Sequence, residues 1–428
     1  MKQTELLEVE AFIYGYKIGI MLMHNHRIYF EYDKAFLQRN IEISPLKLNT
    51  KSTDTPYINK DSSDLYQGMA GVFFDSLPDK HGMPFIYRYF EQKGFLVNDV
   101  TLLHKLTFIA DRGLGAIEYR PKEQENFREF KDVILAKKLH EDMQTILEKD
   151  QENYSIDMLM NIIDSASPVG GARPKMLISY NKDTKAIKYN NKVLDSGYKR
   201  AIIKFDEVYP DADLKDKSID LTKLEYIYMS MAKECGIDIS AIHLHVQDQQ
   251  SHLVIERYDR DEQDSKIHVC SASGLMHKDI SIANVMSYEE LFAFTNKICH
   301  NQSDVTELYR RMIFNALSFN VDDHAKNFEF IMNRQGQWSL SPAFDITYSR
   351  GVVKTHITSI NGKSENFSIE DFLSIALKNL ISEKSALKII ETVSKKLLEF
   401  TLLARKLEVD EETILECASN IKQQRDLL

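Results

Sequence analysis

Two short polar stretches stand on either side of a predicted hairpin: VDDHAKNF (Val321–Phe328) and PAFDI (Pro342–Ile346). The run FEFIM, the turn NRQG and the run QWSL predict the two strands between them. The first stretch holds Asp322 and Asn327, and the second holds Asp345. Taken alone, the first stretch is equally typical of a turn that caps the preceding helix. The addition of Asp345 after a hairpin favours a site built from carboxylate and amide oxygens.

This set of side chains suits phosphoryl transfer. The reaction needs a carboxylate beside the attacking hydroxyl, and metal ligands that neutralise charge on the phosphates. Protein kinases carry their catalytic Asp and a metal-binding Asn as D-x-x-x-x-N. Asp322 and Asn327 have this spacing, whereas Asp323 does not. In kinases a hairpin separates this loop from a second metal-binding Asp, and Asp345 stands at that position here.

A second stretch, HKDISIAN (His277–Asn284), has the same spacing at Asp279 and Asn284. An amphipathic helix that begins near Tyr288 follows it, without a hairpin and without a second Asp at a suitable distance. We therefore interpret this stretch as a polar loop before a helix.

A lysine on a predicted strand is the next candidate. Lys204 ends the run RAIIK, which resembles the V-A-I-K strand whose lysine contacts phosphates in kinases. Glu225 lies on the following predicted helix and is a candidate to orient Lys204. A single strand lysine is more often a solvated one, but the lysine and glutamate in this order favour a phosphate-binding role.

Two further segments are candidate nucleotide contacts. The loop Gly170-Gly171-Ala172-Arg173-Pro174-Lys175 combines small residues, which let backbone N–H groups approach phosphates, with two cations. It matches neither standard phosphate-loop motif, so an ordinary glycine turn remains the alternative. The segment Glu256-Arg257-Tyr258 ends a predicted strand and is either a hinge that offers backbone groups to adenine or a surface strand end.

Composition limits the class of protein. A length of 428 residues is typical of two or three domains, and 43% hydrophobic with 28% charged residues is typical of a soluble globular chain. The 22 Phe and 20 Tyr exclude full disorder. A net charge of −10 argues against binding nucleic acid unaided, although a basic partner would allow it.

The four cysteines form no C-x-x-C, which predicts reduced, buried thiols. The acidic N-terminus lacks the pattern of a signal peptide, and the apolar stretch after it is short, so we expect a cytoplasmic protein with no membrane partner.

Residue periodicity predicts several elements. Strands are expected near residues 13–22 and 26–32, with turn chemistry at Asn25. One helix is expected to stop at Gly236, another to begin at Ser303 as its N-cap, and a third to begin with a capping box at Ser368. A charged helix between residues 122 and 160 is expected to bury one apolar stripe: Phe130, Val133, Ile134 and Leu139.

The order of these parts resembles the HipA family of serine/threonine kinases, which are the toxin halves of bacterial toxin–antitoxin pairs. The resemblance rests on GVFFDSLPD (Gly71–Asp79), RGLGAIEY (Arg112–Tyr119), GGARPK, AIIKF, VIERYDR and DDHAKNF followed by FDI. It implies an α+β, two-lobed protein-kinase-like fold. The expected parts are an N-terminal α/β subdomain (1–120), a mixed nucleotide-binding small lobe (121–260) and a mainly helical large lobe (261–428) with the catalytic and metal-binding loops.

The resemblance also implies roles for single residues. Asp322 is expected to be the catalytic base, and Asn327 and Asp345 the ligands of Mg²⁺. The ATP contacts are expected from the Gly170–Lys175 loop, Lys204, Glu225, Glu256, Arg257, Tyr258 and His324. Family members autophosphorylate a serine just ahead of the glycine loop. Pro168 stands two residues before Gly170 here, so Ser167 is the first candidate and Ser165 the second.

The implied partners are proteins and, indirectly, DNA. The family's best-known targets are aminoacyl-tRNA synthetases, whose phosphorylation arrests growth. Its members bind a small helix-turn-helix antitoxin, HipB, that represses their operon, so operator DNA is expected to be bound through such a partner. Two other functions stay open. One is a catalytically silent co-repressor that acts with a DNA-binding antitoxin, and the other is a kinase of small molecules on a similar two-lobed fold.

Overall fold

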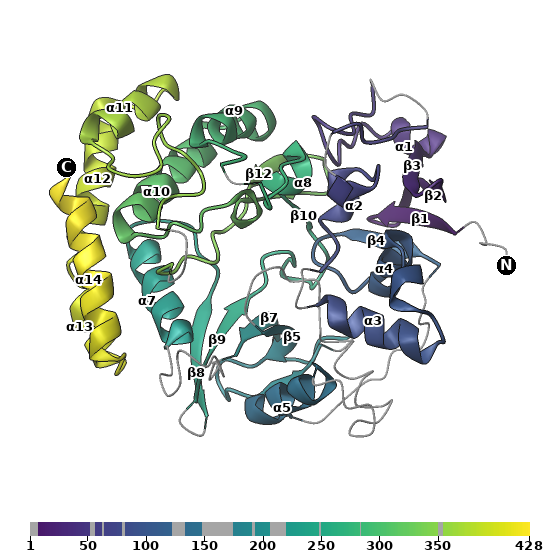
Figure 1. The fold of residues 1–428 in the computed structure, drawn as a ribbon, viewed down its shortest axis with the longest axis horizontal. Coiled ribbons are helices and arrows are strands. Elements are labelled where there is room, and N and C mark those ends of the chain that lie inside the picture. The colour runs from purple at the N-terminus through teal and green to yellow at the C-terminus, as the bar shows by residue number, and fades with distance from the viewer. Residues whose placement is uncertain are drawn as a thin grey trace. The chain divides into compact units, whose positions relative to one another are not determined.

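The computed structural model describes the chain in eleven ranges: 7–51, 56–61, 64–78, 82–121, 133–147, 174–190, 193–205, 220–247, 250–282, 284–349 and 354–428. The chain forms two compact units, each assembled from separate segments (Figure 1). Unit 1 contains residues 1–204, 256–277 and 331–337, and unit 2 contains residues 205–255, 278–330 and 338–428. Each unit therefore draws on both halves of the sequence.

Unit 1 begins with a four-stranded antiparallel sheet in the order β3-β2-β1-β4. Its strands are β1 (Glu8–Ile13), β2 (Tyr16–His24), β3 (Arg27–Tyr32) and β4 (Ile117–Arg120). Tyr14 and Gly15, and then Asn25 and His26, have positive φ angles, which suits the two-residue turns that join twisted strands. The strand predicted near 26–32 and the turn at Asn25 are confirmed, whereas the strand predicted near 13–22 is interrupted by the turn at Tyr14 and Gly15. Alternate β1 residues are fully buried, and this face of the sheet forms a core.

Short helices complete this part of unit 1. They are α1 (Lys34–Leu37), η1 (Asp64–Tyr66), α2 (Gly71–Phe74), α3 (Met83–Gln92), η2 (Val97–Asp99) and α4 (Leu102–Ile109). Helix α4 contacts β1 and β4. Seven of its eight residues are buried, including the polar Lys105 and Thr107.

The rest of unit 1 holds three antiparallel strands: β6 (Ile187–Tyr189), β5 (Lys175–Tyr180) and β7 (Lys199–Lys204). Five of the six β5 residues are buried, which explains its continuous apolar run. Helix α5 (Ala136–Leu147), strand β10 (His268–Ser271) and helix α8 (Ala272–Met276) also belong to this unit. The predicted apolar stripe is partly wrong, because Leu139 is buried whereas 57% of Val133 is exposed, and Phe130 lies outside the described residues.

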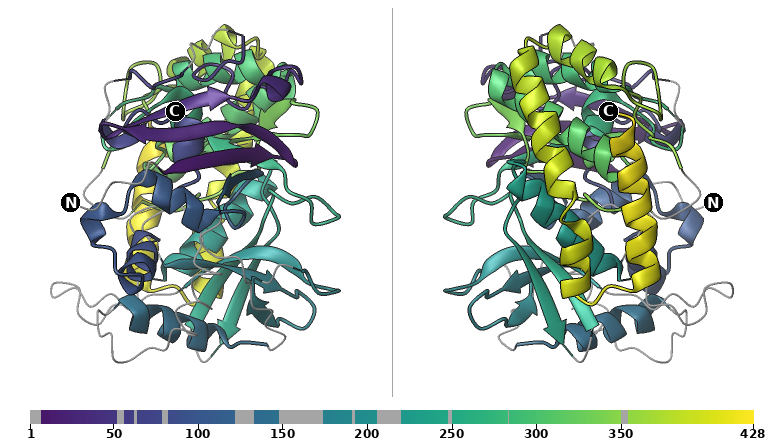
Figure 2. Two further views of the ribbon diagram at one scale, coloured as in Figure 1. Left: turned by 90° about the vertical axis from the view of Figure 1, so that its right-hand side faces the viewer. Right: turned by 90° about the vertical axis from the view of Figure 1, so that its left-hand side faces the viewer.

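Unit 2 is mainly helical. It contains α7 (Leu221–Glu234), the strand β8 (Ile242–Gln247), which pairs with β9 (Gln250–Glu256), and then α9 (Tyr288–Cys299) and α10 (Gln302–Ser318). The segment after α10 carries η3 (Ala325–Asn327), β11 (Glu329–Met332) and β12 (Trp338–Leu340). The chain ends in α11 (Ile369–Lys378), α12 (Glu383–Leu397), α13 (Phe400–Lys406) and α14 (Glu411–Asp426), drawn in yellow-green and yellow in Figure 2.

Helix α10 is the centre of unit 2. The apolar positions predicted from the helical period between Val305 and Leu317 are all buried, and from Arg311 to Ser318 the helix is buried on every side. It packs against α9, α12 and α14. Helix α7 ends at Glu234, and Gly236 follows with a φ of +85°, which confirms the predicted stop. The capping box at Ser368 is also confirmed. The predicted N-cap Ser303 is wrong, because Asn301 caps α10 by accepting a hydrogen bond from the Asp304 N–H.

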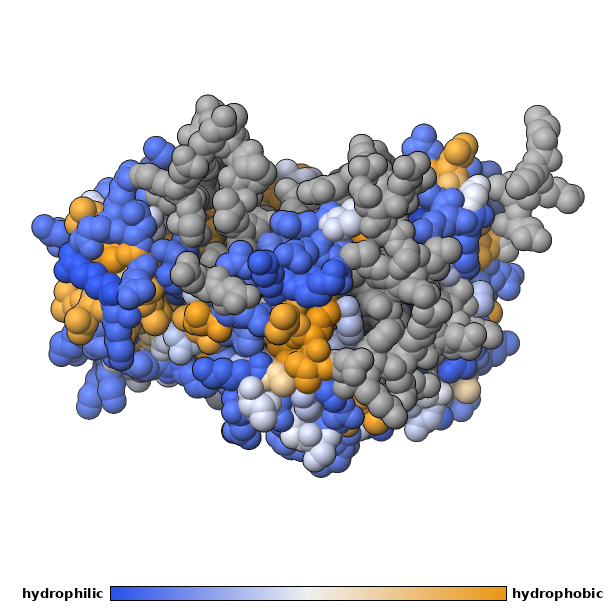
Figure 3. Space-filling view, turned by 90° about the horizontal axis from the view of Figure 1, so that it is seen from below, coloured by the Kyte–Doolittle hydropathy of each residue, from blue (hydrophilic) through white to orange (hydrophobic). Residues whose placement is uncertain are grey.

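The surface and the cysteines add two observations. Leu398, Leu402 and Leu415 are exposed on the last helices, and Figure 3 shows separate apolar areas among hydrophilic residues on one face. All four cysteines are buried thiols outside any disulfide, as predicted. Among the described residues, no helix has both the length and the hydrophobicity needed to cross a membrane.

Candidate active site

The polar loop of unit 2 starts where α10 ends. Phe319 caps the helix with a φ of +60°, and the buried Asn320 follows. The Asn320 backbone N–H donates to the Asn315 carbonyl at 3.0 Å, and its side-chain amide donates to Asn315 Oδ1 at 2.9 Å. Asn320 Oδ1 in turn lies 3.4 Å from the Ser349 hydroxyl. The loop is therefore fixed to the last turn of α10 at its first residues.

Asp323 is the most buried carboxylate of the loop, with a fully buried side chain. Its Oδ1 accepts hydrogen bonds from the Ile357 and Thr358 backbone N–H groups, both at 3.1 Å. Its Oδ2 accepts from the Tyr288 hydroxyl at 3.1 Å and lies 2.9 Å from His356 Nδ1. Burial, and then the Asp323 charge, raise the pKa of Tyr288, which keeps its hydroxyl a donor. Sequence reasoning gave no role to Asp323, and no local pattern identifies its partners.

Asp322 has the opposite surroundings, because 60% of its side chain is exposed. Its backbone N–H donates to the Ser349 hydroxyl oxygen at 3.0 Å, and its Oδ1 lies 3.8 Å from His324 Nε2. Partial burial, and then the Asp323 charge, raise the pKa of the Asp322 carboxyl, while the imidazole of His324 opposes this shift. The carboxylate is therefore fixed through its backbone and open at its side chain, as a group that takes a proton from a substrate must be.

His324 lies beside this carboxylate and is only 22% exposed. Burial lowers its pKa, and the Asp322 charge acts in the opposite direction. Its Nδ1 is buried and has no hydrogen-bond partner in the described part of the chain. This ring nitrogen is therefore a buried polar atom whose hydrogen-bonding capacity the loop does not use.

Asn327 ends the one-turn helix η3, and its side chain folds back onto the loop. Its Nδ2 donates to the Asp322 carbonyl at 2.7 Å, and its backbone N–H donates to the His324 carbonyl at 2.9 Å. With the amide nitrogen used in this way, the remaining side-chain atom is the oxygen Oδ1, which is a hard ligand of the kind that Mg²⁺ prefers.

Asp345 follows β12 and has a φ of +51°. A residue other than Gly rarely adopts this left-handed conformation, although Asp and Asn tolerate it best. Nearby, the Ala343 N–H donates to the Asp238 carbonyl at 2.8 Å, which fixes this segment within unit 2. The same left-handed conformation occurs at turn and cap residues such as Asn25 and Phe319, so the candidate role of Asp345 rests on its place after the hairpin.

The two predicted ligands, the Asn327 amide oxygen and the Asp345 carboxylate, are donor types that Mg²⁺ accepts. The described residues contain no cluster of three or more His, Cys, Asp or Glu side chains that could hold a metal ion. One amide oxygen and one carboxylate are the small ligand set that Mg²⁺ uses when water and substrate phosphates complete its octahedral shell.

The second D-x-x-x-x-N stretch has the role of a turn. Both the backbone N–H of Ser281 and its hydroxyl donate to Asp279 Oδ1, at 3.0 and 2.7 Å. His277 is buried in unit 1, where its ring accepts from the Gly71 N–H at 2.9 Å and lies 2.6 Å from Asp61. These contacts agree with the interpretation of a polar loop before α9.

In unit 1, Lys204 is the last residue of β7 and only 5% exposed. The alternative of a solvated strand lysine is therefore wrong. The register places Lys204 directly opposite Lys175 of β5. Side chains opposite each other in an antiparallel pair lie on the same face, so the two lysines share one face of the sheet. Pro174 and Lys175 are the only members of the predicted glycine loop within the described ranges, and Gly170, Gly171, Ala172 and Arg173 lie outside them, as do Ser165 and Ser167.

The predicted hinge is only partly available to a ligand. The Arg257 N–H donates to the Arg200 carbonyl at 2.9 Å, and the Arg257 side chain forms a buried ion pair with Asp259 at 2.6 Å. The two nearby arginines hold the pKa of Asp259 well below its usual range, although burial acts against them. Arg257 can therefore offer adenine only its carbonyl oxygen. Glu256 and Tyr258 are both half-buried.

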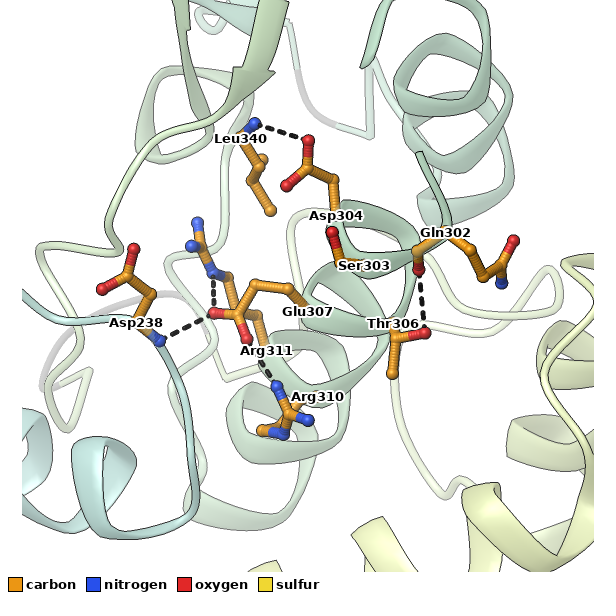
Figure 4. Close-up of a pocket in the computed structure, with 9 residues that line it drawn as sticks. All are labelled: Asp238, Gln302, Ser303, Asp304, Thr306, Glu307, Arg310, Arg311 and Leu340. Carbon is orange, nitrogen blue, oxygen red and sulfur yellow. Dashed lines mark hydrogen bonds and ion pairs between the residues drawn. The ribbon is translucent and has the colours of Figure 1, made fainter. Parts of the chain in front are cut away.

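In unit 2, Glu225 lies on α7 and is 1% exposed. A buried carboxylate needs a cation or hydrogen-bond donors, so its burial agrees with a role beyond a solvated helix face. A separate pocket of unit 2 lies along the first turns of α10 (Figure 4). There Glu307 accepts hydrogen bonds from Arg310, Arg311 and the Asp238 N–H, so its charge is already paired. The residues lining this pocket include none of the predicted catalytic residues.

Comparison with a solved structure defines the class of fold. HipA of Shewanella oneidensis, solved with HipB and its operator DNA, matches 98% of this chain and 96% of its own chain, at a TM-score of 0.66 and 14% sequence identity. The chain accordingly has the two-lobed, kinase-like α+β fold that was predicted. A model of the HipA-like C-terminal domain matches residues 167–399, and a model of the HipA N-terminal domain matches residues 9–120. The chain belongs to the HipA family.

Two relatives match a shorter segment. A protein of Haemophilus influenzae, named provisionally as a kinase, is 29% identical over 138 residues. The protein Y4mE of Sinorhizobium fredii, also named provisionally as a kinase, is 26% identical over 134 residues. Each alignment covers 29% of this chain, and they span 40% and 32% of the two relatives. The chain thus matches less than half the length of either relative.

Proposed function

We propose that this protein is a HipA-type toxin that transfers the γ-phosphate of ATP to a serine or threonine of a protein target. The main support for this proposal is the difference in burial between two neighbouring aspartates of one loop. Asp323 is buried and used by the fold, while Asp322 is exposed, and Asn327 folds back onto the same loop. Family membership and the two relatives named as kinases support it.

In the proposed reaction, Asp322 accepts the proton of the attacking hydroxyl. The hydroxyl oxygen forms a bond to the γ-phosphorus, the bond from that phosphorus to the β–γ bridging oxygen breaks, and ADP leaves. Asn327 and Asp345 would hold Mg²⁺, which supplies charge neutralisation on the phosphates when bound. The backbone contacts of Asp322 to Ser349 and Asn327 fix the base before substrate arrives, so little ordering remains for the reaction step.

Binding of the ATP phosphates is assigned to the positive pair in unit 1. Lys175 and Lys204 lie opposite each other on adjacent strands, so two lysine side chains on one face of the sheet would both donate to phosphate oxygens. The glycine loop that ends at Lys175, and the carbonyl groups at Glu256–Tyr258, complete the proposed nucleotide contacts. Glu225 is proposed to orient Lys204, and His324 to lie close to the nucleotide.

The sequence itself supplies a matched test of the catalytic base. Asp322→Asn should lower γ-phosphate transfer from radiolabelled ATP by at least about 100-fold, because the group that accepts the proton is lost. Asp279→Asn, in the other D-x-x-x-x-N stretch, should leave transfer within about twofold of wild type, because Asp279 accepts hydrogen bonds from Ser281 in its own turn. Equal loss in both variants, or transfer that survives Asp322→Asn, would contradict the assignment.

Partners follow from the family and from the solved relative. We propose a small helix-turn-helix antitoxin as the binding partner, and operator DNA as a ligand only of that complex, since this chain carries a net charge of −10. An aminoacyl-tRNA synthetase is the proposed target. Growth arrest on expression should require Asp322, should be relieved by co-expression of the antitoxin, and should leave the target phosphorylated.

Self-regulation is proposed at Ser167, with Ser165 as the second candidate. Phosphopeptide mapping of the purified wild type and of Asp322→Ala tests this. Phosphate at either serine only in the wild type supports it, whereas phosphate elsewhere, or the same pattern in both, contradicts it.

The alternative is a silent co-repressor, and it is favoured by one observation: the solved relative was captured with HipB and operator DNA. In that case the protein and its antitoxin would bind DNA together, and Asp322→Asn would change nothing. An intact set of Asp322, Asn327, Asp345 and Lys204 argues for the enzyme.

A further inference from the structure

Asp323 links the catalytic loop to two distant parts of unit 2, the start of α9 and the segment 356–358. Its carboxylate contacts Tyr288 at the start of α9, His356, and the backbone N–H groups of Ile357 and Thr358. Its backbone carbonyl also accepts a hydrogen bond from the Thr358 hydroxyl. Every one of these partners lies more than thirty residues away in sequence.

The network continues to the other end of the loop. The Tyr288 hydroxyl accepts a hydrogen bond from Asn315 Nδ2 at 3.0 Å, and Asn315 Oδ1 accepts one from Asn320 Nδ2 at 2.9 Å. The backbone carbonyl of Val321 accepts from the Ile357 N–H at 3.1 Å. Asp322 is therefore held between two anchored residues, Val321 and Asp323, while its own side chain stays open.

The buried Asp323 carboxylate tolerates little change in its hydrogen-bonding groups. Both oxygens of Asp323 accept hydrogen bonds, and no side-chain atom of it is exposed. Replacing one oxygen with an amide NH₂ would place a donor against donors, and the loop would have to shift to relieve the clash. A shift of about 1 Å at a reacting group is enough to cost about 100-fold in rate.

We propose that Asp323 is the positioning residue of this site: it touches no substrate, and it holds Asp322 and the loop to Asn327 in the geometry for transfer. The inference rests on the proposed function, which makes Asp322 the base. It also predicts that Asp323 restrains the motion of the loop, and this restraint can be measured without enzymatic turnover.

The experiment compares two buried carboxylates of unit 2. Asp371 is 4% exposed and accepts hydrogen bonds from Asn361, Lys363 and the Ser368 N–H, but it belongs to the start of α11. Asp323→Asn and Asp371→Asn should therefore cause similar losses of stability. The measurements are ADP release from Mg-ATP as a function of ATP concentration, hydrogen exchange of the peptide covering 320–328, and thermal unfolding.

The positioning role predicts a specific pattern. Asp323→Asn should lower kcat by about 100-fold with KM for ATP within about threefold, and should speed exchange of the 320–328 peptide by at least about tenfold. Asp371→Asn should change neither. If Asp323→Asn does not fold, Tyr288→Phe takes its place, because it removes the hydroxyl that donates to Asp323. It should change kcat and the exchange rate in the same directions, by smaller factors.

Three results decide the matter. Unchanged exchange in the Asp323 variant, or equal loss of kcat in the Asp371 variant, overturns the positioning role. A wild type without turnover, together with faster exchange in Asp323→Asn, shows that the proposed function fails while the anchoring of the loop stands.

Discussion

Asp322 and Asp323 are neighbours with identical side chains and opposite surroundings. The first is 60% exposed, and the second is fully buried with hydrogen bonds to both oxygens. A carboxylate that the fold already uses has little capacity left for a substrate, because its lone pairs are occupied. The exposed one keeps that capacity. Burial thus separates two roles that residue type alone cannot separate.

Lys204 offers a prediction at the same scale. Lys204→Met should lower kcat/KM for ATP by about 100-fold, since the cation proposed to bind the phosphates is lost. The control is Lys199→Met on the same strand, where 52% of the side chain is exposed and faces Glu262. That variant should keep kcat/KM within about twofold, because exposed ion pairs contribute little. The measurement is the initial rate of transfer at several ATP concentrations, with thermal melts of both variants.

At the scale of elements, α10 shows what periodicity can and cannot specify. Its buried face was predictable because apolar residues recur at helical spacing. Its start was not, since both Asn301 and Ser303 are good N-cap residues and stand two positions apart. The choice falls on Asn301, whose side chain also donates to the Cys299 carbonyl and so closes the turn from α9.

The N-cap of α10 gives a prediction about stability. Asn301→Ala should lower the free energy of unfolding of unit 2 by about 1 kcal/mol, because the Asp304 N–H loses its acceptor. Ser303→Ala should cost less than half of that, since Ser303 only donates to the Asn301 side chain. Urea unfolding followed by helical circular dichroism measures both. A larger loss for Ser303→Ala would restore Ser303 as the cap.

At the scale of the whole molecule, two buried histidines of unit 1 make the free energy of unfolding depend on pH. Burial lowers the pKa of His268 and of His277 from the usual 6.5 to about 4, and the carboxylate of Asp61 opposes the shift at His277. The unfolded chain therefore binds protons more readily than the folded chain between about pH 6.5 and pH 4. This contribution to stability is complete above pH 6.5 and is lost as the pH falls through that window.

The test follows from the same linkage. The free energy of unfolding should fall between pH 7 and pH 4.5 in the wild type, and the fall should be shallower in His268→Gln, which removes one titrating group. His24→Gln, at an exposed position of β2, should keep the wild-type slope. Denaturant titrations at four pH values suffice. Equal slopes for wild type and His268→Gln would refute the linkage.

Several conclusions were available from the sequence because they depend on neighbours along the chain. The hairpin after Asn327, the stop of α7 before Gly236 and the buried face of α10 follow from turn residues and periodicity. The spacing of Asp322, Asn327 and Asp345 selected the candidate loop for the same reason, since a spacing is a property of the sequence itself.

Only the tertiary structure decided how these residues are used. It placed Tyr288, His356 and Thr358 around Asp323, put Lys175 opposite Lys204, and tied Arg257 to Asp259. Each of these depends on burial, strand register or contacts between segments far apart in sequence. Such contacts are set by how the packed unit excludes water and pairs its buried polar groups, and no local pattern records that outcome.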